Sequence, residues 1–357
     1  MITRLEQSIG RREAMRLLKW ALTTMGTSGL DTDQYLRVAQ AMVIPSRVDA
    51  HVINNLAITL ASSKHLEDTL GPNEVIDTVL DQHAIVRRLQ TGCPDQFRKP
   101  LQLLDSTMAS TIGGYLIDMG QPHAAIPYFN RARKTAHDAG NPTCAAYAAQ
   151  AASFAARLCG DTPTALDAAA AARALAARTN DHRIKALAEQ MAAGAYAMDG
   201  QYDACMAAFA RAHEFLTNIN APAPNSPVYW VSHSSIDKHV SKALIELNKP
   251  TQAIQAAHTA LTHYDRTYIG GYAMSEIRLG HALILDKEIT EATRILANAA
   301  PHAHLYPRLT TELHTARASL QPWQHTPAVK TLDAQLRAHK LIPNPHTKQN
   351  NNHNDTT

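Results

Sequence analysis

Residues 186–212 read ALAEQMAAGAYAMDGQYDACMAAFARA, and this stretch decides the fold. Small and aromatic residues from Ala188 to Tyr196 recur at three- and four-residue spacing, which predicts a helix with small side chains on one face. Gly200 suits the position just past a helix end, where a left-handed backbone is required. Apolar residues around Phe209 continue the helical spacing. The stretch therefore predicts two antiparallel helices joined by a turn at Gly200.

The turn glycine recurs along the chain. Gly120, Gly160 and Gly200 are separated by 40 residues each, and each follows a predicted helix. Asn248 and Lys287 stand at the corresponding turn of a fourth and a fifth copy. A fixed period of this size indicates a repeated supersecondary unit. The sequence therefore predicts an all-α protein, built as a superhelical stack of antiparallel helix pairs.

These copies resemble the tetratricopeptide repeat, which has a Leu-Gly pair, a turn Gly, and then an Ala, a Phe and an Ala at set offsets. The first copy contains Ile112-Gly113, Gly120, Ala125, Phe129 and Ala132, and the fifth contains Leu279-Gly280. A period near 40 exceeds the usual 34 or so and is typical of HEAT-like pairs, which remain the structural alternative. The turn glycine and the residues after it favour a tetratricopeptide-like α-solenoid.

Composition argues against several classes of function. The formal net charge of +3 over 357 residues does not indicate a nucleic-acid or membrane partner. The four cysteines have unrelated spacings and are interpreted as small apolar residues in a reducing compartment, which makes the cytoplasm the expected location. The 19 histidines form no HExxH motif or compact His/Cys cluster. The sequence also contains no glycine-rich phosphate loop and no nucleophile-base pair. We therefore expect no metal, no cofactor and no enzymatic activity.

The chain is predicted to have three parts. Residues 1–45 form an N-terminal helical arm, residues 46–341 form the tetratricopeptide-like array, and residues 342–357 form a polar tail. The arm contains paired arginines before an apolar run, as export signals do, but Arg16 and Lys19 interrupt that run. The tail is rich in Asn and His, and we expect it to be disordered.

The arm also has the outline of a helix-turn-helix DNA reader. A helix, a glycine-containing turn and a second helix over residues 31–42 follow one another. The second helix opens with Asp31 and Asp33, which would face phosphates with the wrong sign of charge. The sequence therefore argues against direct nucleic-acid binding.

A narrower resemblance covers about residues 46–300. The segments that carry it are Ser46-Arg47-Val48-Asp49-Ala50, Leu70-Gly71-Pro72, Cys93-Pro94, Tyr229-Trp230 and Tyr264-Asp265. They resemble the sensory region of actinobacterial Xre-type regulators, in which a DNA-binding domain precedes a tetratricopeptide array. The resemblance implies a signal-responsive regulator. Because this sequence begins close to the paired arginines, we expect it either to act without touching DNA, or to be a fragment or a divergent member that uses another subunit to do so.

The first helices of stacked pairs line a concave surface that binds extended peptides or partner helices. The repeat register assigns ten side chains to this groove: Tyr147, Gln150, Phe154, Arg157, Gln190, Lys238, His239, Lys242, Arg278 and His281. Cations and amides together can hold the backbone and the carboxylates of a peptide. We therefore expect a peptide or protein segment, acidic in character, as the partner. A merely solvated helix face is the alternative.

Three hypotheses of function follow. The leading one is a regulatory protein whose groove binds a peptide or partner segment and thereby changes its curvature or its pairing with another subunit, including a second copy of the chain. The second is a passive scaffold that senses no ligand. The third is a divergent transcriptional regulator that contacts DNA directly, and only this one predicts salt-dependent binding to duplex DNA.

Overall fold

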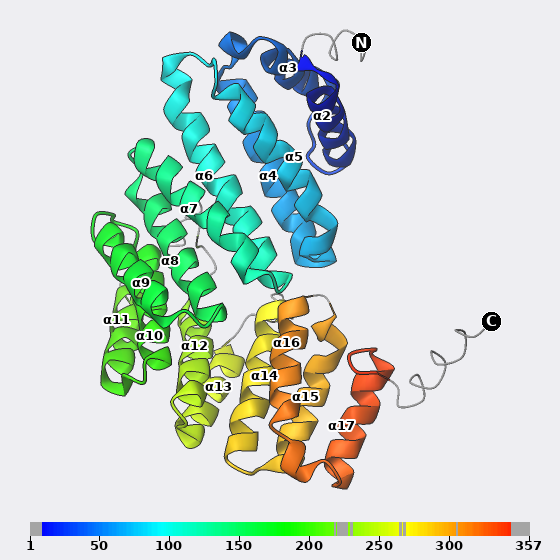
Figure 1. Cartoon of the computed structure of the whole chain (residues 1–357), viewed down its shortest axis with the longest axis vertical. Helices are drawn as coiled ribbons and strands as arrows, with labels where there is room; N and C mark the ends of the chain where they lie inside the picture. The colour runs from blue at the N-terminus through cyan, green and yellow to red at the C-terminus, as the bar shows by residue number, and fades with distance from the viewer. Residues whose placement is uncertain are drawn as a thin grey trace, which may run out of the picture. The chain divides into compact units, whose positions relative to one another are not determined.

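The computed structural model describes residues 9–217, 219, 228, 231–263, 266, 269–304 and 306–343, and all regular elements in these ranges are helices (Figure 1). The all-α prediction is therefore confirmed. The chain divides into two compact units, Met1–Ser232 and His233–Thr357. The predicted boundaries at residues 45 and 341 stay predictions. Tyr229-Trp230, Tyr264-Asp265 and nearly all of the predicted tail lie outside the described residues.

Unit 1 begins with two shorter helices and continues with helix pairs. Its elements are α2 (Arg11–Thr24), α3 (Thr32–Val43), the 3₁₀ helix η1 (Pro45–Arg47), α4 (Ala50–Leu70), α5 (Pro72–Leu89), α6 (Asp95–Asp118), α7 (Pro122–Asp138), α8 (Pro142–Leu158), α9 (Thr162–Ala176), α10 (His182–Met198) and α11 (Tyr202–Thr217). Consecutive helices pack as pairs, and the first helices also contact one another, α6 with α8 and α8 with α10. This ladder of first helices is the arrangement that the repeat register predicts.

The predicted turn glycines adopt the left-handed backbone. Gly120, Gly160 and Gly200 have φ values of 74°, 77° and 73°. The residue after each glycine donates its backbone N–H to a carbonyl five residues earlier, at 2.7, 3.0 and 2.9 Å. This bond satisfies a carbonyl at the helix end and reverses the chain into the second helix of the pair.

In unit 2 the same turn forms without glycine. Asn248 and Lys287 have φ values of 53° and 66°, and the residues that follow them donate to Leu244 O and Leu283 O at 2.8 and 2.9 Å. A left-handed conformation costs a residue with a Cβ about 1–2 kcal/mol. The repeat register predicted both turn positions, and the structure confirms them.

The Leu-Gly pairs of the repeat bring the two helices of a pair into close contact. A Cβ on Gly113 would lie 2.5 Å from the ring of Phe129, and a Cβ on Gly280 would lie 2.6 Å from Leu296. The large side chain of each second helix therefore rests on the bare backbone of the first helix. Phe129 is 1% exposed and Leu296 is fully buried.

Unit 2 continues the paired arrangement and closes it. Its elements are α12 (His233–Glu246), α13 (Pro250–His263), α14 (Ile269–Leu285), α15 (Ile289–Ala303), α16 (Pro307–Ala318), the 3₁₀ helix η2 (Gln321–Trp323) and α17 (Pro327–Ala338). Helices α12 and α14 pair with α13 and α15, whereas α16 packs on α14 and α17 packs on α15. The last two helices thus cover the end of the stack, which would otherwise expose apolar surface.

The cores of the units differ in side-chain size. One apolar cluster of unit 1 extends from Ile9 to Tyr115 and includes the fully buried Trp20, so α2 and α3 share a core with α4 to α6. Between α8 and α10 the core is a cluster of alanines: Ala156, Ala165, Ala169, Ala192 and Ala195. In unit 2 it is rich in leucine instead.

Candidate partner-binding surfaces

The first of two candidate surfaces lies on α8 and α10 of unit 1. We call it the unit 1 surface, and it carries five of the predicted groove residues: Tyr147, Gln150, Phe154, Arg157 and Gln190. The α8 members follow one another at three- and four-residue spacing, so they share a helix face. Tyr147, Phe154 and Arg157 are half-buried, whereas both glutamines are 1% exposed. The register therefore places accessible side chains on this face at Tyr147, Phe154 and Arg157, whereas the two glutamines are buried beneath it.

Gln150 ties two first helices together. Its Nε2 donates to the carbonyl oxygen of Ile184, in the first turn of α10, at 2.8 Å. Its Oε1 is buried and accepts no hydrogen bond from the described part of the chain. Gln150 therefore bridges neighbouring repeats through Nε2, and its Oε1 can still accept a hydrogen bond.

Gln190 occupies the same register position one repeat later. Neither its Nε2 nor its Oε1 has a hydrogen-bond partner among the described residues. Among the described residues of unit 1 no further first helix follows α10, and α12 belongs to unit 2. A buried polar group without a partner costs about 1–3 kcal/mol. This amide is thus the most expensive polar side chain on the unit 1 surface.

Arg157 lies across the same surface. A Cβ on Gly194 would stand 2.0 Å from Nη1 of Arg157, so the guanidinium rests directly on the backbone of α10. Gly194 follows Gln190 by one helical turn, so the two residues lie on the same face of α10. The absence of a side chain at Gly194 makes this position of the arginine possible.

The second candidate surface lies on α12 and α14 of unit 2. We call it the unit 2 surface, and it carries the remaining predicted residues: Lys238, His239, Lys242, Arg278 and His281. Lys242 Nζ lies 3.2 Å from Glu312 Oε2 of α16 and 3.9 Å from Glu246 Oε1. Burial raises the pKa of Glu312, but Lys242 and Arg278 outweigh it and hold that pKa below its ordinary value. The basic character predicted for this face is therefore partly neutralised.

The other members of the unit 2 surface are also held by the fold. Arg278 is 3% exposed and donates from Nη1 to the carbonyl oxygen of Lys238 at 2.7 Å. His281 Nε2 lies 3.3 Å from Ser319 Oγ. Burial, followed by the nearby Lys242, lowers the pKa of His281. His239 is half-buried on α12.

The ten predicted residues thus fall into two sets of five, one in each unit, and a groove common to both sets stays a prediction. Sequence reasoning missed Glu312, because the repeat register assigns no position in the atypical helix α16. It also missed Gly194, whose role depends on a side chain from the neighbouring repeat.

The described residues contain no group of three or more His, Cys, Asp or Glu side chains arranged to hold a metal ion. None of the helices that the structure describes is both long enough and apolar enough to cross a membrane.

Comparisons with known proteins agree with the fold. No protein-family model matches the chain, and a search of curated proteins finds no match. Among solved structures, the chain is similar to a Rap protein complexed with competence and sporulation factor, with a TM-score of 0.54 and 10% sequence identity. The similarity covers 92% of this chain and 97% of that chain. The protein is therefore a tetratricopeptide-like α-solenoid, and the likeness at this identity concerns the fold alone.

Proposed function

We propose that this protein is a regulator that binds an extended peptide or a segment of a partner protein along the unit 1 surface. Stacked first helices offer the geometry for such recognition. A Rap protein of similar fold has been solved in complex with competence and sporulation factor, which supports a binding role. A place in transcriptional or other signalling control follows from the resemblance to Xre-type regulators, and the cytoplasm is the matching location.

The observation that carries this proposal is the buried Gln190 amide, whose N–H and C=O groups find no partner in the described part of the chain. A primary amide is complementary to a peptide group, because each has one carbonyl acceptor and an N–H donor. A bound backbone at this point would satisfy both groups and recover their desolvation cost. The Arg157 guanidinium, which rests on Gly194, would lie against such a segment and could bind a carboxylate on it.

The unit 2 surface would select for acidic partners. A partner carboxylate would compete with Glu312 for Lys242 and Arg278. Because Glu312 offsets part of this charge within the chain, we expect the unit 2 surface to contribute selectivity for acidic segments rather than affinity.

The test uses a phage-displayed pool of random linear ten-residue peptides, panned on the full chain. We expect enriched sequences, and the synthetic form of the best one should lose at least tenfold in affinity with Gln190→Met in calorimetry. Gln255→Met is the matched control, because Gln255 is exposed on α13 and lies on neither surface. A lack of enrichment, or equal affinity of wild type and Gln190→Met, contradicts the proposal.

Two further measurements separate the alternatives. Small-angle scattering of the chain with and without the enriched peptide should show a change in the radius of gyration; an unchanged value would favour a passive scaffold. Fluorescence anisotropy with labelled duplex DNA should show no binding at physiological salt. Salt-dependent, sequence-selective binding would favour the direct transcriptional regulator instead.

A further inference from the structure

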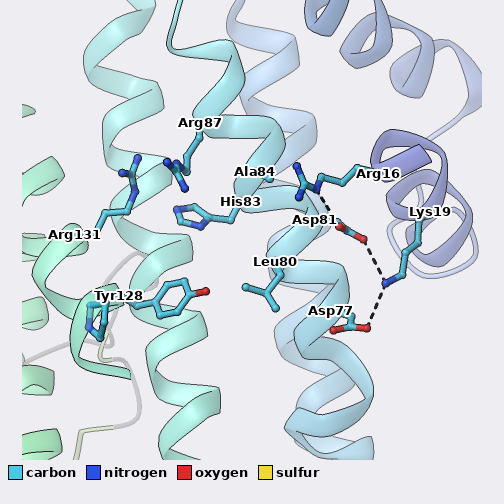
Figure 2. Close-up of a pocket in the computed structure, with 11 residues that line it drawn as sticks. Arg16, Lys19, Asp77, Leu80, Asp81, His83, Ala84, Arg87, Tyr128 and Arg131 are labelled. Carbon is cyan, nitrogen blue, oxygen red and sulfur yellow. Dashed lines mark hydrogen bonds and ion pairs between the residues drawn. The ribbon is translucent and has the colours of Figure 1, made fainter. Parts of the chain in front are cut away.

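A polar cavity lies between α2, α5 and α7 of unit 1 (Figure 2). Its volume is about 540 Å³, which is within the range of small-molecule sites. The charged and polar side chains that line it are Arg16, Lys19, Asp77, Asp81, His83, Arg87, Tyr128 and Arg131. Four of these are permanent cations and two are carboxylates, but Arg131 is also paired with Asp105 behind the lining, so the charge of Arg87 is the part of the lining charge without a carboxylate partner among the described residues.

One side of the cavity is electrically balanced. Lys19 Nζ lies 3.3 Å from Asp77 Oδ2 and 3.5 Å from Asp81 Oδ2, and Arg16 Nε lies 3.4 Å from Asp81 Oδ1. Figure 2 shows these contacts between α2 and α5. They fasten α2 to α5 and leave little charge for a ligand.

The opposite side is built on a buried carboxylate. Asp105 of α6 is fully buried and accepts from Nε of Arg131 at 2.9 Å and from Nη2 of Arg131 at 2.5 Å. His83 Nε2 lies 2.7 Å from the same carboxylate. Asp105 thereby fixes the orientation of Arg131 and His83, and the Nη1 group of Arg131 remains for another acceptor.

Arg87 supplies the uncompensated charge. It is exposed, and neither its guanidinium nor the hydroxyl of Tyr128 has a partner among the described residues. Figure 2 shows the guanidinium groups of Arg87 and Arg131 on the same side of the cavity, together with the His83 ring. Arg131 is held by Asp105 but keeps its Nη1 group, and Arg87 adds a cation without a carboxylate partner in the described part of the chain, so an anion between them could accept from both guanidinium groups.

We propose that this cavity binds the phosphoryl group of a small molecule through Arg87, Arg131 and Tyr128. The donors come from two helices, α5 and α7, and a phosphoryl group carries about 1.5 to 2 negative charges at neutral pH where a carboxylate carries one, so the two guanidinium groups favour it. The volume leaves room for an organic group beyond the phosphate, and the balanced side can accommodate its polar part. This site is distinct from the unit 1 and unit 2 surfaces.

The test is calorimetric titration of the full chain with inorganic phosphate, with pyrophosphate and with acetate, at matched ionic strength in chloride buffer. We expect saturable binding of phosphate, tighter binding of pyrophosphate, and weaker binding of acetate. Arg87→Gln should weaken phosphate binding about tenfold or more, and Tyr128→Phe should weaken it about threefold.

Arg133→Gln is the matched control. Arg133 is exposed on α7 and does not line the cavity. Its substitution by Gln removes the same charge as Arg87→Gln does. Phosphate affinity should change less than about twofold in this variant, and it should be unchanged in Gln190→Met, which tests the peptide proposal separately. Absent saturation, equal effects of the two arginine substitutions, or acetate binding as tight as phosphate would each overturn the proposal.

Discussion

The unit 1 and unit 2 surfaces occupy equivalent register positions but treat their polar groups differently. On the unit 1 surface, Gln190 is buried with its hydrogen-bonding capacity unused by the described residues. On the unit 2 surface, Lys242 meets Glu312 and Arg278 meets the Lys238 carbonyl. The repeat register alone would rank the second surface higher, since it holds more charge.

This difference shows that the number of charged side chains is a poor guide to the binding surface of a repeat protein. A cation that already has a carboxylate must exchange it for a ligand at little net gain. A buried amide without a partner has already lost its hydrogen bonds to water. A ligand that bonds to it therefore offsets the full desolvation cost. Five predictions concern the polar and apolar groups of the two units, and no expected effect is larger than the one before it.

The comparison first requires that the core and the surface of unit 1 be separable. Phe209→Ala should lower the free energy of unfolding by about 3–5 kcal/mol, because Phe209 is 2% exposed and its removal leaves a cavity among small side chains. Phe154→Ala on the unit 1 surface should cost clearly less, since Phe154 is only half-buried. Urea unfolding measures both, and equal losses would show that the surface is part of the core.

Glu276 of unit 2 gives a pH dependence of stability. Burial raises its pKa from 4.5 to about 7, although Arg266 and Arg294 oppose the shift. The folded state therefore holds its proton more tightly than the unfolded state does, and the free energy of unfolding should fall by about 3 kcal/mol as pH rises from 4.5 to 7. Glu276→Gln should abolish this decrease in a series of urea titrations. A wild-type profile that is flat in this window would contradict the prediction.

Asp105 of unit 1 gives a pH dependence of stability in the opposite direction, with stability lost as the pH falls. Burial opposes ionisation, but His83, Arg131 and Gln90 hold its carboxylate and lower its pKa from 3.8 to about 2. Its stabilisation of about 2 kcal/mol is present above pH 3.8 and should be lost as pH falls to about 2. NMR titration of the Asp105 carboxyl carbon checks the pKa. A value near 3.8 would show that the network adds no stability.

Charge reversal at the unit 2 surface should be costly. Lys242→Glu would place three carboxylates together, because Glu246 and Glu312 already flank this position. We expect a loss of about 2 kcal/mol in the free energy of unfolding. If Lys242 were instead a solvated side chain on an exposed helix face, the substitution would change stability little. Lys242→Met is the control and should lose less. If the two variants unfold alike, Lys242 is solvated and the unit 2 surface is free to bind.

The smallest effect is the most specific. Gln150→Met removes a bond to Ile184 O and should destabilise the chain by about 1 kcal/mol, whereas Gln190→Met removes two unsatisfied groups and should stabilise it by a similar amount. Thermal unfolding of both variants without any ligand decides the matter. Changes of the same sign would remove the distinction between the two glutamines.

Much of the fold follows from local patterns in the sequence. The glycine spacing predicted the turns, and the register correctly identified Asn248 and Lys287 as left-handed positions without glycine. The repeat register identified the Leu-Gly pairs, and the structure adds that Gly113 lies against the Phe129 ring. These features are predictable because each depends on residues within one repeat.

The candidate sites are less predictable, because they depend on contacts between repeats. The register gave Gln150 and Gln190 the same role, but only Gln150 reaches a carbonyl of a following helix in its unit. Glu312 comes from a helix outside the repeat pattern. The cavity at Arg87 requires α2, α5 and α7 to meet, and no motif in the sequence links Arg16, His83 and Arg131.

The alanine core between α8 and α10 has a consequence for local motion. Small side chains bury few methylene groups, so this part of the stack is held mainly by close backbone contact and by bridges such as Gln150. We expect its amide protons to exchange with solvent through local opening before those of the large apolar cluster around Trp20. A segment bound across α8 and α10 would thus stabilise the part of the stack whose own side chains bury the least apolar surface.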